Sequence, residues 1–378
     1  RKLVVTPDTY YFGVGDTLSD LDINASSLKF FDELMRSSGP SGYEMPCAAV
    51  FRKRLEPFAD EVRVDVTGNS IAVLNPKSRF RVMLAGHYDE IGFQVVYITD
   101  EGLITFREVG GIDKVTLPGL EVEILTASGK IPGVIGRKPI HLQTPKERET
   151  VMEIRDLWID IGAESKAEAE KLVSVGDPIA FRVNYSRFGK HRVMSKGLDD
   201  KIGAFVIAEA FRILSERKCK IGVYAVGTVQ EELGLRGAKT SAFSVDPQAA
   251  IAVDVGFATD VPGVEKKQWG DVTLGGGPIV CKNADINPVL LKKLLDAAKR
   301  GKIPVQIECG HRASGGTDTA QIQLSRAGVA TALVSIPNRY MHTPVEMCDL
   351  RDAENAAKLI ADTILSLNEK SSFLPGID

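Results

Sequence analysis

Two adjacent glutamates, Glu231 and Glu232, follow the apolar run 221–229 after one intervening residue, Gln230. We interpret this run as a buried strand, which would place both carboxylates at one rim of a sheet. The alternation of side chains across a strand breaks at its end, so the two neighbours can take different tasks there. One carboxylate can bind a metal ion while the other accepts a proton. The pair alone is weak evidence, because Glu-Glu is common on solvated surfaces.

Four further residues of metal-ligand type lie at the ends of apolar runs or in the adjoining turns. In open α/β sheets, ligands bind outside the carboxyl ends of the strands, so we expect these residues to gather at one edge. They are His87 at the end of run 81–87, Asp199 in the polar turn before a long helix, Asp254 at the end of run 249–254, and His342 shortly after run 330–337.

Histidine, aspartate and glutamate bind zinc or cobalt-like divalent ions. Five such ligands with one shared carboxylate can hold two ions, which in such sites lie about 3.5–4 Å apart around a bridging water. The ions lower the pKa of that water and polarise a carbonyl group. A nearby carboxylate that binds no metal must then accept the proton, and the Glu231–Glu232 pair can supply it.

The composition indicates which partners and which cellular location to expect. The chain has 378 residues and is 44% hydrophobic, which is enough for a substantial core. Lys and Arg number 47 against 50 Asp and Glu, so we expect no nucleic-acid partner, which would require a basic face. No apolar stretch reaches the roughly 20 residues of a membrane helix, so we expect no membrane partner. Five cysteines without a C-x-x-C pair, and no signal-peptide pattern in residues 1–27, predict a cytoplasmic location.

The order of apolar patterns indicates an α/β fold with an insertion. Segments 28–93 and 191–378 alternate strand and helix patterns, which predicts a catalytic domain with a mostly parallel sheet covered by helices on both faces. Residues 94–190 are strand-like and rich in turns, so we expect a small β-rich, barrel-like domain inserted there. Residues 1–27 are polar and are interpreted as an N-terminal extension.

Several motifs together resemble the M42 family of metallo-aminopeptidases, which includes glutamyl, leucyl and tetrahedral (TET) aminopeptidases. The resemblance spans about residues 28–368 and covers every expected metal position in order. The motifs are His87-x-Asp89, Leu198-Asp199-Asp200-Lys201, Glu231-Glu232-Leu-Gly, Ala252-Val-Asp254, Met341-His342-Thr, the segment 133–142 and Gly315-Gly-Thr-Asp318.

The resemblance implies a zinc-peptidase-type fold and a role for each residue. His87 and Asp254 would bind one metal ion, Glu232 and His342 the other, and Asp199 would bridge them. Glu231 would be the general base. Asp89 would accept a hydrogen bond from His87 and fix its tautomer. The peptide between Asp199 and Asp200 is a candidate for the cis form.

The resemblance also implies the substrates and the assembly. Substrates would be peptides with a free N-terminus, from which one residue is released at a time. The insert 94–190 would mediate dimerisation, and dimers would form a homo-oligomer that can reach a tetrahedral dodecamer. Arg312 or Arg339 could serve an acidic side-chain preference, although the sequence does not fix their direction.

Two other functions stay open at this stage. Some members of the family carry glucanase labels, and a glycoside hydrolase would use paired acids beside a sugar, but it needs no histidines. A non-catalytic scaffold or assembly protein is the second alternative, although it would not need the full set of ligands. Among the remaining candidates, we interpret Asp200 as a helix cap, Asp318 as either a cap or a support for the site, and His141, His191 and His311 as surface or structural residues.

Overall fold

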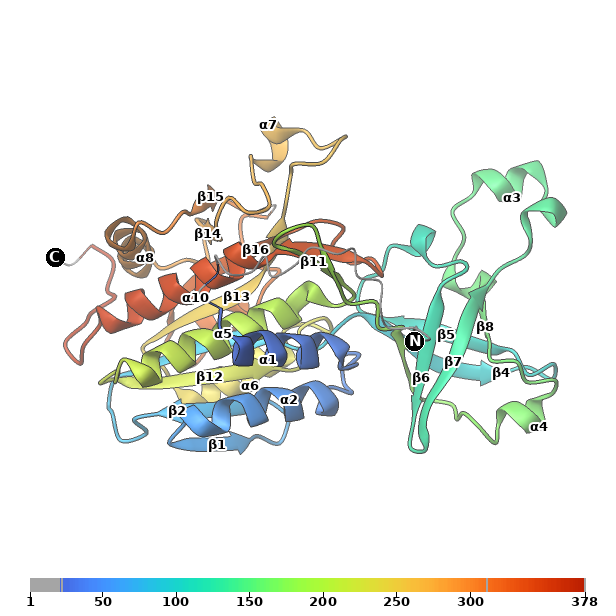
Figure 1. Ribbon diagram of the computed structural model, residues 1–378, viewed down its shortest axis with the longest axis horizontal. Helices are drawn as coiled ribbons and strands as arrows, with labels where there is room; N and C mark the ends of the chain where they lie inside the picture. The colour runs from blue at the N-terminus through green and yellow to red at the C-terminus, as the bar shows by residue number, and fades with distance from the viewer. Residues whose placement is uncertain (1–20, 22, 311, 377–378) are drawn as a thin grey trace, which may run out of the picture.

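The computed structural model describes residue 21 and residues 23–310 and 312–376. Most of the expected extension 1–27 therefore lies outside the described residues, as does His311. Figure 1 shows a layered α/β domain with a small barrel projecting from one end. Within the described part of the chain, no helix is long and apolar enough to cross a membrane.

An eight-stranded mixed sheet forms the centre of the α/β domain. Its middle strands are parallel to one another, as the sequence predicts. At one edge, β2 runs antiparallel to both β1 and β12, and on the other side β14 runs antiparallel to β16. The middle strands are buried along nearly their whole length, which explains their continuous apolar sequences. In spatial order the strands are β1 (Glu61–Val64), β2 (Ser70–Leu74), β12 (Gly222–Thr228), β3 (Arg81–His87), β13 (Ala249–Phe257), β16 (Ala330–Asn338), β14 (Ile279–Cys281) and β15 (Gln306–Glu308).

Helices cover both faces of this sheet. One layer contains α1 (Ala25–Arg36), α2 (Met45–Leu55), α5 (Leu198–Glu216), α8 (Pro288–Gly301) and α10 (Leu350–Leu365), which pack on one another, and the other contains α6 (Arg236–Val245) and α9 (Thr319–Gln323). Helix α1 begins three residues before residue 28, the predicted start of the catalytic domain. The Asn24 side chain accepts a hydrogen bond from the Ser27 N–H and caps the helix there. The short α7 (Lys266–Trp269) lies in a projecting loop (Figure 1).

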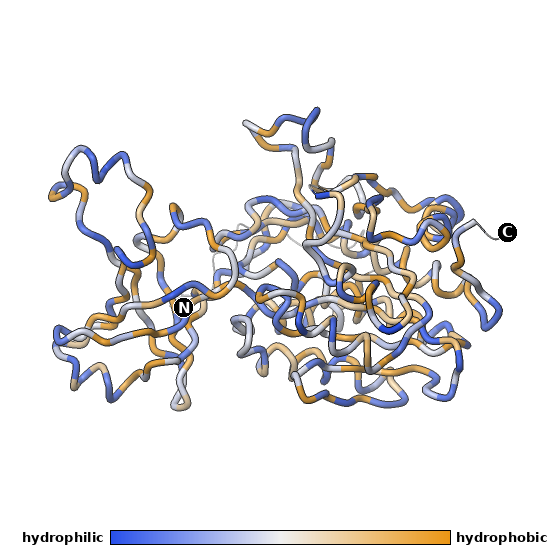
Figure 2. The backbone as a smooth tube through the Cα atoms, turned by 180° about the vertical axis from the view of Figure 1, so that it is seen from behind, coloured by the Kyte–Doolittle hydropathy of each residue, from blue (hydrophilic) through white to orange (hydrophobic). Residues whose placement is uncertain are grey.

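The predicted β-rich insert is confirmed as a closed six-stranded barrel with its own apolar core. A separate three-stranded sheet joins β10 (Ser186–Phe188), β11 (Arg192–Ser195) and β17 (Glu346–Asp349). The loop that carries α3 is largely hydrophilic in Figure 2 and extends away from the barrel core. The elements of the insert are β4 (Gly92–Ile98), β5 (Ile104–Val109), β6 (Glu121–Thr126), β7 (Gly129–Gly136), α3 (Pro145–Glu149), β8 (Trp158–Asp160), α4 (Lys166–Ala169) and β9 (Pro178–Phe181).

Short 3₁₀ turns connect several of these elements. They span Glu56–Phe58, Lys114–Thr116, Ile140–Leu142 and Ile154–Asp156.

Helix α5 approaches strand β3 unusually closely. A β-carbon added to Gly86 would lie 2.9 Å from the carbonyl carbon of Gly203 and 3.0 Å from the nitrogen of Ala204. Two glycines therefore allow the two backbones to touch. His87 follows Gly86, and Asp199 lies in the first turn of α5. This contact therefore brings the side chains of His87 and Asp199 close together.

We expect Gly86→Ala to destabilise the protein by about 1–3 kcal/mol, because the added methyl group meets backbone atoms that cannot rotate away. The measurement is the free energy of unfolding in urea. Gly301→Ala is the matched control, because a methyl group there meets the end of the flexible Ile303 side chain. The control should be neutral or stabilising by up to about 1 kcal/mol. Equal effects of the two substitutions would contradict the tight contact.

Candidate metal centre

The carboxyl ends of the adjacent strands β12, β3, β13 and β16 bring the predicted residues together. His87 ends β3 and pairs in register with Thr228 at the end of β12. A cavity of about 630 Å³ opens at this edge of the sheet. The residues that line it include Asp199, Glu231, Glu232, Asp254 and His342.

The donor atoms form two groups that share one residue. His87 Nε2 lies 3.1 Å from Asp199 Oδ1 and 3.9 Å from Asp254 Oδ1. His342 Nε2 lies 3.3 Å from Asp199 Oδ2 and 3.7 Å from Glu232 Oε1. Within each group the donor atoms all lie within 4.8 Å of one another. Each oxygen of Asp199 thus faces a different histidine, which is the arrangement that a bridging carboxylate requires.

Carboxylates are crowded at this site. Burial, with a further contribution from Asp199, raises the pKa of Asp254 and that of Glu232 to about 8 each. A hydrogen bond with Asp199 raises the pKa of His342 to about 9. Glu232 Oε1 is buried and has no hydrogen-bond partner among the described residues. Divalent cations would relieve this repulsion and satisfy that oxygen, and the imidazole and carboxylate donors suit zinc or cobalt.

Glu231 lies beside the donor groups and belongs to neither of them. Its Oε2 atom is 3.9 Å from His87 Nε2, and its side chain is 11% exposed. Burial raises the pKa of Glu231 well above its usual range, and His87 opposes this shift while Asp254 reinforces it. A carboxylate in this position can accept and return a proton at the edge of the cavity.

Asp89 holds the turn that carries both glutamates. Its two carboxylate oxygens accept hydrogen bonds from the backbone N–H groups of Glu231 and Glu232, at 3.1 and 3.2 Å. His87 Nδ1 lies 3.1 Å from the carbonyl oxygen of Asp89 and 3.4 Å from its carboxylate. Asp89 therefore contacts His87 through two of its oxygens while it also positions the Glu-Glu turn.

Glu346 is a supporting residue that the sequence did not single out. Its carboxylate accepts hydrogen bonds from the N–H groups of Asp199 at 2.9 Å and of His342 at 3.2 Å. Burial, reinforced by Asp199, raises the pKa of Glu346 well above its usual range. Its position four residues after His342 was the available signal, but one acid in a short segment is too common to interpret.

The structure also shows the surroundings of Asp200 and Asp318. The peptide between Asp199 and Asp200 is cis, as the resemblance implied. Asp200 Oδ1 accepts a hydrogen bond from the N–H of Gly203, which agrees with its interpretation as a cap. Asp318 makes no side-chain cap bond; it accepts a 2.7 Å hydrogen bond from Thr228 Oγ1, beside His87. Asp318 therefore supports the end of β12.

A buried ion cluster lies beside the donor residues in the chain. Glu90 accepts hydrogen bonds from Lys196 Nζ at 2.5 Å and Lys201 Nζ at 2.7 Å, and all three side chains are at most 2% exposed. Glu90 also accepts a bond from the N–H of Gly39, and Lys201 donates to the carbonyl of Ser37. The cluster ties the segment after His87 to the segment around Asp199.

The remaining candidates lie away from the donor groups or at the cavity wall. His141 is exposed on the insert, and His191 is buried before β11. Arg339 forms two hydrogen bonds with Asp260, at 2.8 and 2.7 Å, so its charge is already paired. Arg312 lines the cavity.

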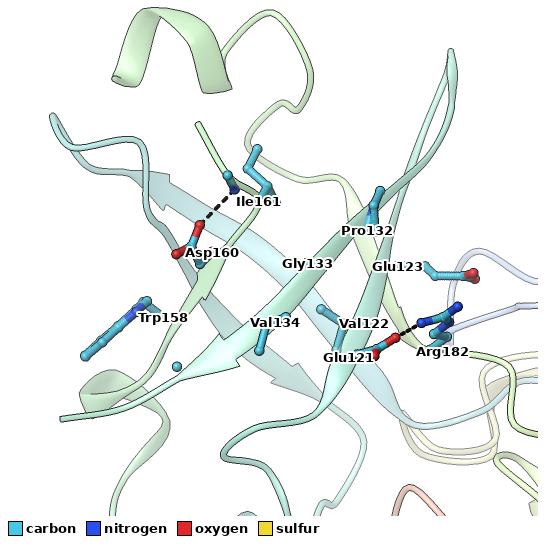
Figure 3. A pocket seen from close by; sticks show the side chains of 12 residues that line it. Glu121, Val122, Glu123, Pro132, Gly133, Val134, Trp158, Asp160, Ile161 and Arg182 are labelled. Carbon is cyan, nitrogen blue, oxygen red and sulfur yellow. Dashed lines mark hydrogen bonds and ion pairs between the residues drawn. The ribbon is translucent and has the colours of Figure 1, made fainter. Parts of the chain in front are cut away.

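A second cavity, of about 600 Å³, lies on the barrel (Figure 3). Its side chains come from β6, β7, β8 and the end of β9, and Figure 3 shows Glu121 paired with Arg182 at one side and Trp158 at the other. Neither donor group contributes to its lining. The candidate chemistry therefore lies in the cavity of the α/β domain.

Comparison with known proteins decides the family. The model of the M42 glutamyl aminopeptidase family matches residues 68–359. The lysyl aminopeptidase of Pyrococcus furiosus is 37% identical over 91% of this chain and 98% of its own length. The chain belongs to the M42 family.

Solved structures agree with this M42 assignment. The chain resembles the TET aminopeptidase of a marine-sediment Thaumarchaeota archaeon, with a TM-score of 0.87 and 38% identity over 91% of this chain and 97% of that one. It also resembles the TET1 peptidase of Pyrococcus horikoshii, which can assemble into a tetrahedron or an octahedral shell. That comparison gives a TM-score of 0.80 and 35% identity over 90% of this chain and 100% of that one. The zinc-peptidase type of fold is thus confirmed, and aminopeptidase activity is the function that the M42 relatives support.

We expect Glu90→Gln to destabilise this M42 protein by about 3–5 kcal/mol, because it leaves two fully buried ammonium groups without their carboxylate. Chemical denaturation followed by circular dichroism would measure the change. The control is Glu61→Gln, which removes an exposed pair with Arg63 and should change stability by less than about 1 kcal/mol. A loss below 1 kcal/mol in Glu90→Gln would refute the bracing role of the cluster.

Proposed function

We propose that the protein is a two-metal aminopeptidase that removes residues one at a time from the free N-terminus of peptides. The observation that carries this proposal is the position of Asp199, whose two oxygens face His87 and His342 separately. A single-ion site would not need a second histidine on the far oxygen of the same carboxylate.

The donor groups suggest how each ion would be held. His87 and Asp254 would hold one ion and Glu232 and His342 the other, with Asp199 shared. When bound, two such ions supply an activated water and polarise the carbonyl of the scissile peptide bond. Zinc and cobalt are the metals that best match the donors.

The side chains around the donors complete the proposed mechanism. Glu231 accepts the proton of the attacking water and returns it to the leaving amine. Its raised pKa suits this exchange, because a more basic carboxylate takes a proton more readily. Asp89 fixes Glu231 through the backbone bond to its N–H and limits the orientation of the His87 ring.

We further propose that the chain forms a homo-oligomer through the insert 94–190 and acts in the cytoplasm. The assembly of the Pyrococcus horikoshii relative supports the first point. The second rests on the five cysteines, all of which are free thiols. The M42 membership favours peptide cleavage over the glycoside hydrolase and the non-catalytic scaffold.

Metal removal gives the first test. We expect the stripped protein to lose hydrolysis of aminoacyl-p-nitroanilides and to regain it with zinc or cobalt, while N-acetylated substrates stay uncleaved throughout. Release of p-nitroaniline measures the rates. Cleavage that persists after metal is removed, or that includes blocked substrates, would rule out this function. Absence of cleavage with every metal would favour the scaffold alternative.

Substituting the proposed base tests the mechanism separately. We expect Glu231→Gln to lower kcat by about 10²–10⁴-fold, because the amide cannot accept the proton. Metal content measured by mass spectrometry should equal that of the unchanged protein, because Glu231 lies outside both donor groups. Asp199→Asn is the comparison variant and should lose metal as well as activity. If Glu231→Gln keeps its turnover, another group is the base.

A further inference from the structure

One charged side chain in the active-site cavity, Glu308, has no partner within the part of the chain that the structure describes. Glu308 ends β15, at the edge of the sheet, and lines the cavity that holds the donor groups. Its backbone is fixed by the bond from the Lys282 N–H to its carbonyl oxygen at 2.8 Å. Its carboxylate forms no hydrogen bond or ion pair with any described residue, and it is half-buried. A desolvated carboxylate without a partner is unfavourable unless a ligand supplies the missing cation.

Glu308 also lies away from the strands that carry His87 and Asp254. Burial raises the pKa of Glu308, and no neighbouring charge among the described residues contributes to that shift. The pKa of Asp254 and that of Glu232, in contrast, are raised partly by Asp199. In the sheet, β16 and β14 separate the edge strand β15, which carries Glu308, from β13, which carries Asp254, so the two residues line different parts of the cavity.

Apolar side chains line the same cavity. Phe257, Leu333 and Met341 do so from β13, β16 and the turn after β16. This combination suits a side chain with a long methylene stem and a charged end, because the stem can lie along apolar surface while the end reaches a carboxylate.

We propose that Glu308 is a specificity-determining residue that receives the ammonium or guanidinium group of an N-terminal lysine or arginine. This inference rests on the proposed aminopeptidase function and names the substrate class of that site. The family description and the Pyrococcus furiosus relative carry the names of different amino acids, so the cavity of this chain must decide its own preference.

Arg312 is the rival group, because it would favour an acidic residue. It lines the cavity too, but its side chain is exposed, so water already solvates its charge. It lies in the loop after β15. Further along this loop, the Asp285 carboxylate accepts hydrogen bonds from the Ser314 hydroxyl and the Gly315 N–H. A half-buried carboxylate on a strand gains more from a cation than an exposed guanidinium gains from an anion.

The substrate α-amine is the other cation that Glu308 could receive. The α-amine is separated by one carbon atom from the scissile carbonyl, so it must stay beside the donor groups. Since Glu308 lies on the edge strand, with β14 and β16 between it and β13, the end of a long side chain fits its position better than the α-amine does.

The test compares lysyl and norleucyl aminomethylcoumarin substrates, which differ chiefly in the terminal ammonium group. In the metal-loaded protein we expect a higher kcat/KM for the lysyl substrate. Glu308→Gln should reduce the lysyl-to-norleucyl ratio by about 10–100-fold, chiefly through KM, because one charge-assisted bond is lost. Glu308→Asp should recover part of the ratio, and the control Arg312→Gln should keep it within about threefold.

Binding gives a second readout that does not depend on turnover. Calorimetry should show that Glu231→Gln binds free lysine more tightly than norleucine, and that adding Glu308→Gln removes the difference. A uniform loss on both substrates would overturn the proposal, because Glu308 would then bind the α-amine. A preference for glutamyl substrates that Arg312→Gln abolishes would overturn it in favour of the rival. No hydrolysis of either substrate with any metal would instead count against the proposed function itself.

Discussion

The shared carboxylate of Asp199 is the constraint on which the rest of the site depends. It can face His87 and His342 only if the start of α5 lies between the ends of β3 and β16. Two features fix that position. The glycine contact between β3 and α5 sets the distance between helix and strand, and Glu346 accepts the N–H bonds of both Asp199 and His342. Backbone contacts as well as side chains therefore fix the position of Asp199 between the two histidines.

Charge is distributed unevenly around this bridge. Buried carboxylates meet at the donor groups, and their mutual repulsion makes the site a strong acceptor for cations. The Glu90 cluster lies beside it in the chain and contains two ammonium groups for one carboxylate. Removing a partner from such a cluster is costly, so the cluster holds its segments in one arrangement. The same segments contain Asp89 and Asp199, which lie next to the cluster residues Glu90 and Lys201 or two residues from them in the chain.

In the proposed function, catalysis and the choice of substrate depend on different strands of the sheet. Its central parallel strands end at the candidate donors, where Glu346 and Asp89 accept bonds from the backbone N–H groups of Asp199, His342 and Glu232. The edge strands β14 and β15 and the loop after them form the wall that contains Glu308 and Arg312. Changes at this edge can alter which side chain fits without moving the donors, because no donor residue lies on these strands.

The sequence by itself predicted the central strands, most helices, the β-rich insert and the candidate donor residues that the structure brings together. These features are local: an apolar run predicts a buried strand, and an acid or histidine at its end predicts a ligand. Only the tertiary structure decided the antiparallel pairing of β14, the support from Glu346, the ion cluster at Glu90 and the unpaired state of Glu308. Each of these depends on contacts between segments far apart in the chain. Asp199 and Glu346, for example, are 147 positions apart, and no short-range pattern records that they meet.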